Sequence, residues 1–145
     1  TAVSDFIKNP IVIRNKYNLD QEEVTEKILK KLILEDLDNF LKELGTGFSY
    51  IENEYKIKIG NTFNYIDLLL YNIKFNCYVV IELKVTELKK EHIGQIQIYM
   101  NYVDKNIKII NQDKTIGVII CKKDNGYYIE YSSDNRIFSK NYILS

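Results

Sequence analysis

The chain has 145 residues and a mass of 17.1 kDa, a length that fits one domain with a sizeable buried core. With 46% hydrophobic and 28% charged residues it is too apolar for a disordered segment, and no apolar run approaches the roughly 18 residues of a membrane span. Twenty basic and twenty acidic side chains give no net charge. This balance excludes a strong overall attraction to nucleic acid, so any such binding must be local.

The two cysteines, Cys77 and Cys121, lie far apart in apolar, strand-like segments. They form neither a CxxC motif nor a Cys/His spacing, so the sequence indicates no disulfide framework and no zinc site. The chain does not open with a basic stretch followed by an apolar core, which is the pattern of a signal peptide. We therefore expect a cytoplasmic protein without a membrane partner.

Residues 1–19 are mostly polar around a short apolar patch and predict a lead-in segment. Residues 20–145 predict a single domain. It starts with one long helix over residues 20–44, because apolar residues recur there at helical spacing and two glycines follow.

Three strand-like runs come next, at residues 48–59, 62–71 and 75–85. The breaks between them, at residues 60–61 and 72–76, have the composition of hairpin turns. These runs predict an antiparallel meander.

Helical spacing returns at residues 88–105, and the apolar run at 115–121 is typical of a buried central strand. A weaker strand is predicted at 127–132, followed by a short tail. The order of elements predicts an α/β fold with a central mixed sheet, an antiparallel meander plus a further strand, flanked by helices.

The run 75–85 carries charge at its end. Alternate strand residues share a face, so Glu82 and Lys84 follow Tyr78 and Val80 on one side of the sheet. This pattern indicates a core strand that opens into a site. A Glu-x-Lys tripeptide by itself is common, and by itself more often reaches solvent at the rim of a sheet.

Asp67 makes the functional interpretation stronger. It is the only charge on its predicted strand face, which it shares with Phe63, Tyr65, Leu69 and Tyr71. A buried carboxylate is costly unless it is paired or binds a metal ion. If the strands are hairpin neighbours, Asp67 and Glu82 lie side by side, and either a metal ion or an ion pair with Lys84 satisfies Asp67.

Two adjacent carboxylates repel each other, and Mg²⁺ relieves the repulsion. This ion prefers oxygen ligands and usually takes one or two carboxylates, waters and a substrate phosphate. Asp67, Glu82 and the backbone carbonyl of Leu83 would form such a partial shell. Lys84 is then placed to orient or deprotonate an attacking water and to stabilise the charge that develops on phosphorus.

The helices offer further candidates. Gln95 and Tyr99 are i,i+4 neighbours that either contact the site or lie on a solvated helix face. Glu35 continues the apolar stripe of the first helix, so it points either inward toward the metal or to solvent. His92, the sole histidine, has no second His or Cys nearby, which favours a structural role.

Five segments in this order resemble the PD-(D/E)XK nuclease superfamily, and more closely the C-terminal nuclease domain of the YhcG-type nucleases. They are FLKELGTGF (40–48), YIDLLLY (65–71), VIELK (80–84), EHIGQIQIY (91–99) and IGVIIC (116–121). The resemblance implies a restriction-endonuclease-like core. One departure from the pattern is that Ile66, not proline, precedes Asp67. Many superfamily members lack that proline, and its loss removes no ligand.

The resemblance also implies Mg²⁺-dependent hydrolysis of phosphodiester bonds in DNA, with Mn²⁺ as a substitute. Asp67 and Glu82 correspond to metal ligands and Lys84 to the catalytic lysine. Gln95 with Tyr99 corresponds to a QxxxY element, and Glu35 to the acidic residue of the first helix.

The resemblance further implies that a helical domain precedes this one, so we expect the C-terminal part of a longer protein. Nucleases of this fold often form dimers, so a homodimer is one expected state of this protein. Residues 55–125 carry eleven basic and seven acidic side chains, a net charge of +4 that suits nucleic acid. Two alternatives are a catalytically silent module that binds nucleic acid or a protein, and a general binding domain with a structural Asp67–Lys84 pair.

Overall fold

The computed structural model describes residues 7–123 and 126–145. The strands are β1 (Ile11–Ile13), β2 (Phe48–Ile59), β3 (Thr62–Asn72), β4 (Cys77–Glu87), β5 (Ile116–Lys123) and β6 (Ile137–Leu144). The helices are α1 (Glu26–Leu34), α2 (Leu37–Leu44), α3 (Lys90–Asn106) and the short α4 (Gly126–Glu130), and a 3₁₀ turn, η2 (Gln21–Glu23), precedes α1. Among these described helices, none has the length and apolar character needed to cross a membrane.

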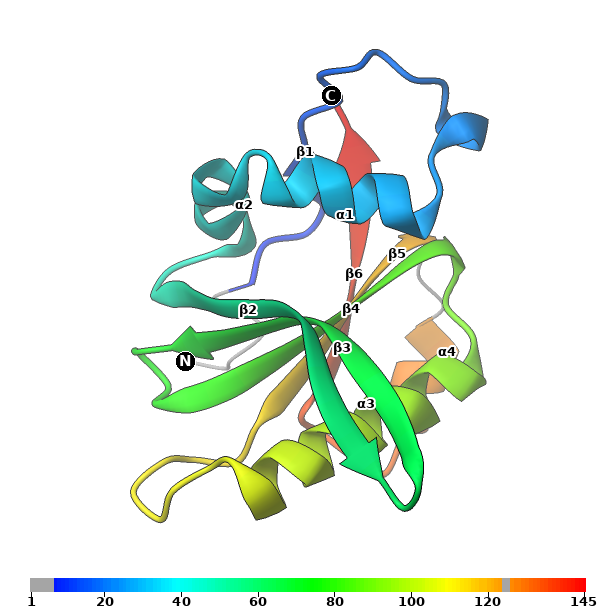
Figure 1. The fold of residues 1–145 in the computed structure, drawn as a ribbon. Coiled ribbons are helices and arrows are strands. Elements are labelled where there is room, and N and C mark those ends of the chain that lie inside the picture. Colours follow the sequence, from blue (N-terminus) through cyan, green and yellow to red (C-terminus); the bar gives the residue numbers. More distant parts are fainter. Residues whose placement is uncertain (1–6, 124–125) are drawn as a thin grey trace.

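The strands form one six-stranded mixed sheet in the order β1-β6-β5-β4-β3-β2. β2, β3 and β4 are the antiparallel meander, and β4, β5, β6 and β1 run parallel. Helices α1 and α2 cover one face of the sheet, and α3 with α4 lies on the other (Figure 1). The predicted class, a mixed sheet flanked by helices, is confirmed.

The expected lead-in segment contributes to the sheet. Ile11 pairs with Tyr142, and Ile13 with Leu144, so β1 lies parallel to β6 at one edge. β6 itself occupies most of the expected tail. Neither strand was predicted, because both are short and their pairing joins the two ends of the sequence.

The predicted helix over 20–44 is wrong in its continuity. Thr25 is an N-cap whose hydroxyl accepts a hydrogen bond from the Ile28 amide, so α1 starts only after η2. Asp36 then leaves the helical conformation, with φ −139° and ψ 46°, and separates α1 from α2. The break turns α2 so that Phe40 and Leu44 reach the core.

The predicted strand at 127–132 is also wrong, because its first residues form α4. Tyrosine and isoleucine are common in strands, and five helical residues are too few to show a helical period. α4 packs on α3 and β6 and buries part of Ile129.

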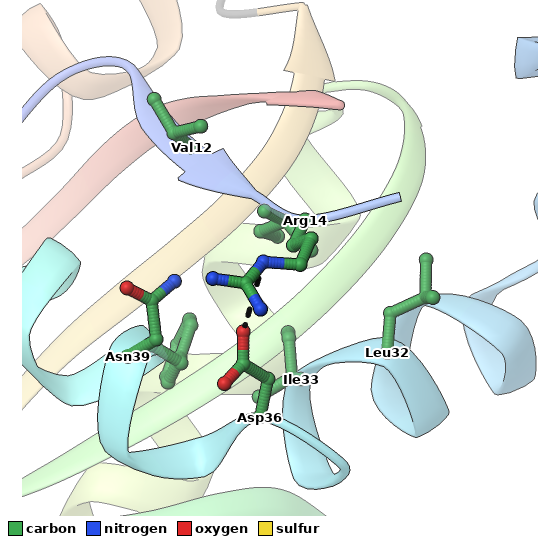
Figure 2. Close-up of a pocket in the computed structure, with 8 residues that line it drawn as sticks. Val12, Arg14, Leu32, Ile33, Asp36 and Asn39 are labelled. Carbon is green, nitrogen blue, oxygen red and sulfur yellow. Dashed lines mark ion pairs between the residues drawn. The ribbon is translucent and has the colours of Figure 1, made fainter. Parts of the chain in front are cut away.

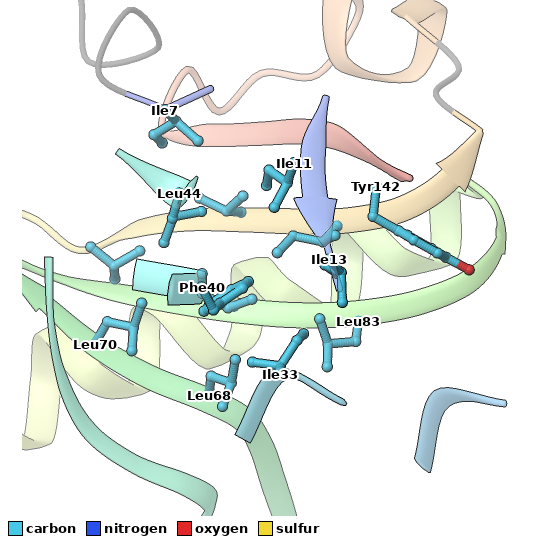
Figure 3. Packing of buried hydrophobic residues seen from close by; sticks show 14 of the residues in the cluster. Ile7, Ile11, Ile13, Ile33, Phe40, Leu44, Leu68, Leu70, Leu83 and Tyr142 are labelled. Carbon is cyan, nitrogen blue, oxygen red and sulfur yellow. The ribbon is translucent and has the colours of Figure 1, made fainter. Parts of the chain in front are cut away.

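Each face of the sheet has its own apolar core. On the α1 face, strand residues pack against Ile33, Phe40 and Leu44, and β1 closes the cluster with Ile11 and Ile13 (Figure 3). On the α3 face the cluster is formed by Leu69, Val80, Ile96, Met100, Val103 and Ile119. These two layers fix β3, β4 and α3 relative to one another.

Candidate active site at the fork between β3 and β4

The site lies where the β3–β4 ladder ends. Backbone pairing extends from Asn72–Cys77 to Leu68–Ile81, and beyond that point side chains take the place of the ladder. The Asp67 amide donates to Glu82 Oε2 at 2.9 Å, and the Leu83 amide donates to Asp67 Oδ2 at 2.9 Å. Backbone groups of the fork therefore hold the two carboxylates side by side.

The alternation of β3 is interrupted at this point. Ile66 and Leu69 are both buried in the α3-side core, which strict alternation forbids for residues three apart. On the neighbouring strand β2 the register also shifts, and Glu54, which lies opposite Asp67, has a positive φ of 48°. The prediction that Asp67 shares a face with Leu69 was therefore wrong, because the irregularity turns Asp67 toward α1.

Lys30 of α1 is the ion-pair partner of Asp67. Its Nζ lies 2.8 Å from Asp67 Oδ1 and also bonds the carboxylate of Glu54. Burial lowers the pKa of Lys30, but the hydrogen bonds to these two carboxylates outweigh burial and raise it. The sequence did not indicate Lys30, because nothing in its local pattern links a lysine of the first helix to a strand 37 residues later.

Glu82 is the buried carboxyl of the pair, with 3% of its surface exposed. Burial, followed by the negative charge of Asp67, raises the pKa of Glu82 to about 8. Without a further cation, Glu82 is therefore mainly protonated at neutral pH. A divalent cation between the carboxylates would remove this conflict.

The backbone carbonyl of Leu83 completes a set of hard oxygen donors. The N–H and C=O groups of one strand residue point toward the same neighbouring strand. Because the Leu83 amide is directed at Asp67, its carbonyl also faces the fork. Among the described residues, no group of three or more His, Cys, Asp or Glu side chains is placed to hold a metal ion, so the fork offers two carboxylates and a carbonyl. This set fits Mg²⁺, which fills its remaining positions with water and phosphate.

On the α3 side, a chain of hydrogen bonds leads away from β4. Lys84 Nζ donates to Gln95 Oε1 at 3.2 Å, and Gln95 Nε2 donates to the Tyr99 hydroxyl at 3.3 Å. The pKa of Tyr99 is raised by burial and then by the negative charges of Glu82 and Asp67. The structure thus brings Lys84, Gln95 and Tyr99 to the fork.

Two other candidates have different surroundings. His92 Nδ1 accepts a hydrogen bond from the Lys89 amide at 3.0 Å and caps the start of α3. Glu35 bonds the Tyr17 hydroxyl, and one of its oxygens lies 2.8 Å from Lys16 Nζ. Glu35 follows Lys30 by five residues, which is about 140° around a helix, so the structure does not bring Glu35 to the fork.

A small cavity of about 10 Å³ lies elsewhere, between β1 and the junction of α1 and α2 (Figure 2). Arg14 and Asp36 form an ion pair beside it, with 3.6 Å between Nε and Oδ2. The cavity holds about one water molecule and no larger ligand. The fork is the candidate site for chemistry because it brings together Asp67, Glu82 and Lys84.

An acidic residue on the second strand of a meander and Glu-x-Lys on the third, followed by a helix and a parallel strand, define a PD-(D/E)XK nuclease fold. The model of the YhcG PDDEXK nuclease domain matches residues 5–144. The chain belongs to that family.

The curated relative "Putative nuclease YhcG" from Escherichia coli (strain K12) is 24% identical over 115 residues. The match covers 79% of this chain and 30% of that protein, so the chain spans about a third of its relative.

Solved structures share the fold. A repair endonuclease from Pyrococcus abyssi is similar with a TM-score of 0.55 and 17% identity, over 81% of this chain and 46% of that one. EndoMS in its dsDNA2 complex gives a TM-score of 0.59 and 18% identity, over 85% and 48%.

Proposed function

We propose that this domain is a nuclease that hydrolyses phosphodiester bonds of DNA with the help of a divalent metal ion. The observation that carries the proposal is the fork itself. Asp67 and Glu82 are held side by side by backbone amides, and Lys84 follows on the same strand. A buried pair of carboxylates beside a lysine has little value for stability and fits phosphoryl-transfer chemistry.

Asp67, Glu82 and the Leu83 carbonyl would hold Mg²⁺, with Mn²⁺ as a substitute. The bound cation supplies Lewis-acid stabilisation of the charge that develops on the phosphodiester. Lys30 Nζ holds Asp67 Oδ1 through its 2.8 Å ion pair, and the Leu83 amide donates to Oδ2. This arrangement orients the Asp67 carboxylate before any metal ion arrives.

We assign to Lys84 the role of contacting the attacking water and the phosphate. Gln95 accepts one of its three N–H groups, which fixes the ammonium and leaves two donors free for an attacking water or a phosphate oxygen. Tyr99 accepts from Gln95 and positions it in turn. In this scheme Lys84 is catalytic, whereas Gln95 and Tyr99 are positioning residues.

DNA as substrate is supported by the structural neighbour EndoMS, which was solved in a complex with DNA. The basic segment 55–125 supports a polyanionic substrate as well. Substrate targeting would then reside in the rest of a longer protein, since the matched relative is about three times as long as the match.

The test is cleavage of a plasmid and of a single-stranded oligonucleotide with Mg²⁺ or Mn²⁺. We expect Asp67→Asn, Glu82→Gln and Lys84→Met to lose activity by about 10² to 10⁴-fold while circular dichroism stays unchanged. Glu87→Gln, an exposed change on the same strand, is the matched control and should keep full activity.

Calorimetric titration of Mg²⁺ into wild type and Asp67→Asn completes the test. Cleavage that survives all three substitutions overturns the proposal. A folded protein that neither binds metal nor cleaves points instead to the catalytically silent module.

A further inference from the structure

The β2–β3 hairpin continues past the fork and carries an exposed row of side chains. Lys56 pairs with Tyr65, and Lys58 with Phe63, and directly opposed residues share a face of the sheet. We call these four residues the hairpin strip.

The hairpin strip lies on the same face as the site carboxylate. Asp67 lies opposite Glu54, and Lys30 bonds both of them from α1. Counting two residues at a time along each strand leads from this pair to Lys56 and Tyr65 and then to Lys58 and Phe63. At about 3.3 Å per residue, the two rings start roughly 7 and 13 Å from the Asp67 backbone.

The fold does not require aromatic residues at these positions. The opposite face of the hairpin is the one that is buried, with Ile57 at 1% and Ile66 at 0% exposure. On the strip, Phe63 is 51% and Tyr65 47% exposed. A polar strand face would leave the same core in place, so the exposed rings call for another explanation.

The hairpin strip is positively charged, and its lysine ammonium groups lie close to an aromatic ring. Lys56 Nζ lies 4.1 Å and Lys58 Nζ 5.8 Å from the centroid of the Phe63 ring. The two acidic residues at its inner end, Glu54 and Asp67, are already paired with Lys30. The strip therefore presents alternating cationic and aromatic groups up to the edge of the site.

We propose that the hairpin strip binds unpaired nucleotides next to the scissile phosphate, with one base stacked on each ring and phosphates contacted by the lysines. A duplex satisfies the lysines but hides the faces of its bases, whereas an unpaired strand uses both. The inference deepens the proposed function, on which it rests: the preferred substrate has a single-stranded segment that enters the site along the hairpin.

The test is a binding measurement in a metal chelator, so that cleavage does not interfere. Fluorescence anisotropy compares a single-stranded oligonucleotide with a duplex of equal length, on the wild type and on Phe63→Leu/Tyr65→Leu. Leucine keeps an apolar side chain but cannot stack, so we expect the affinity for the single strand to fall about tenfold or more, with the duplex changed less than twofold.

Two further variants separate stacking from charge. Lys56→Gln/Lys58→Gln should lower the affinity for the single strand and for the duplex by similar factors, and should reduce the dependence of both affinities on salt concentration. Tyr131→Leu, which removes a tyrosine that is 80% exposed on another part of the surface, is the matched control and should change neither affinity. Both single substitutions, Phe63→Leu and Tyr65→Leu, are measured too, with thermal melting to confirm folding.

Equal loss for single strand and duplex, no loss at all, or the same loss in Tyr131→Leu would overturn the inference. Its failure is distinguishable from failure of the proposed function. If the protein binds single strands through the hairpin strip but does not cleave DNA, the inference holds and the nuclease proposal fails. If the protein cleaves DNA but shows no preference for single strands, the nuclease proposal holds and the inference fails.

Discussion

The buried carboxyl of Glu82 makes the stability of the metal-free protein depend on pH. The pKa of Glu82 is about 8 in the folded chain against an ordinary value of 4.5. One pKa unit corresponds to about 1.4 kcal/mol, so ionised Glu82 lowers the free energy of unfolding by up to about 5 kcal/mol. Below pH 4.5 the carboxyl is neutral in both states and costs nothing. The cost grows as the pH rises above 4.5 and is complete above pH 8.

Glu82→Gln keeps the shape and an oxygen that accepts from the Asp67 amide, but it does not ionise. In urea unfolding with a chelator, we expect the variant to match wild type within about 1 kcal/mol at pH 4.5 and to exceed its stability by several kcal/mol at pH 9. Excess Mg²⁺ should reverse the order at high pH, because the metal ion binds the folded wild type.

Glu87→Gln removes an exposed carboxyl from the same strand and should shift stability by less than about 0.5 kcal/mol at every pH. A difference between wild type and Glu82→Gln that stays constant from pH 4.5 to 9 would refute the reasoning. It would mean that Glu82 ionises in the folded chain as easily as in water.

Three more predictions concern stability and are measured by urea unfolding. Lys30→Met leaves two carboxylates without their cation and should cost about 1–3 kcal/mol in chelator, with part recovered on adding Mg²⁺. Arg136→Met removes the partner of Asp104 and Asp134 and should cost about 3 kcal/mol, whereas Lys42→Met, from an exposed ion pair, should cost under about 0.5. Gly117→Ala places a Cβ 2.5 Å from the Met100 sulfur and should lower the free energy of unfolding by about 1–3 kcal/mol. An unchanged urea midpoint would show that α3 can shift on β5 to make room for the methyl group.

β3, β4 and α3 could be predicted from the sequence because the residue patterns that specify them lie within each element. Alternation and helical spacing are visible within about ten residues, and these three elements carry the acidic residues, the lysine and the Gln-x-x-x-Tyr pair. The side-by-side position of Asp67 and Glu82 followed from one hairpin. A site built from consecutive elements can be predicted in this way.

What escaped prediction depends on distant contacts or on a single irregular residue. β1 and β6 pair across about 130 residues, and Lys30 reaches Asp67 from another layer. The irregularity at Asp67 reverses the strand face, although the sequence of β3 gives no sign of it. The break at Asp36 is one non-helical residue inside an otherwise continuous apolar stripe.

The pairing of β1 with β6 connects both ends of the described chain to the sheet that carries the site, so that a force on the chain can be transmitted to it. Ile7 is bridged to Gly45, and β1 lies at the edge of the sheet, beside β6. Tension applied at Ile7 would act first on its bridge to Gly45 and then, strand by strand through β1, β6 and β5, on β4. Glu82 and Lys84 lie on that last strand, so a load applied at the start of the domain would be carried by the sheet to the residues of the fork.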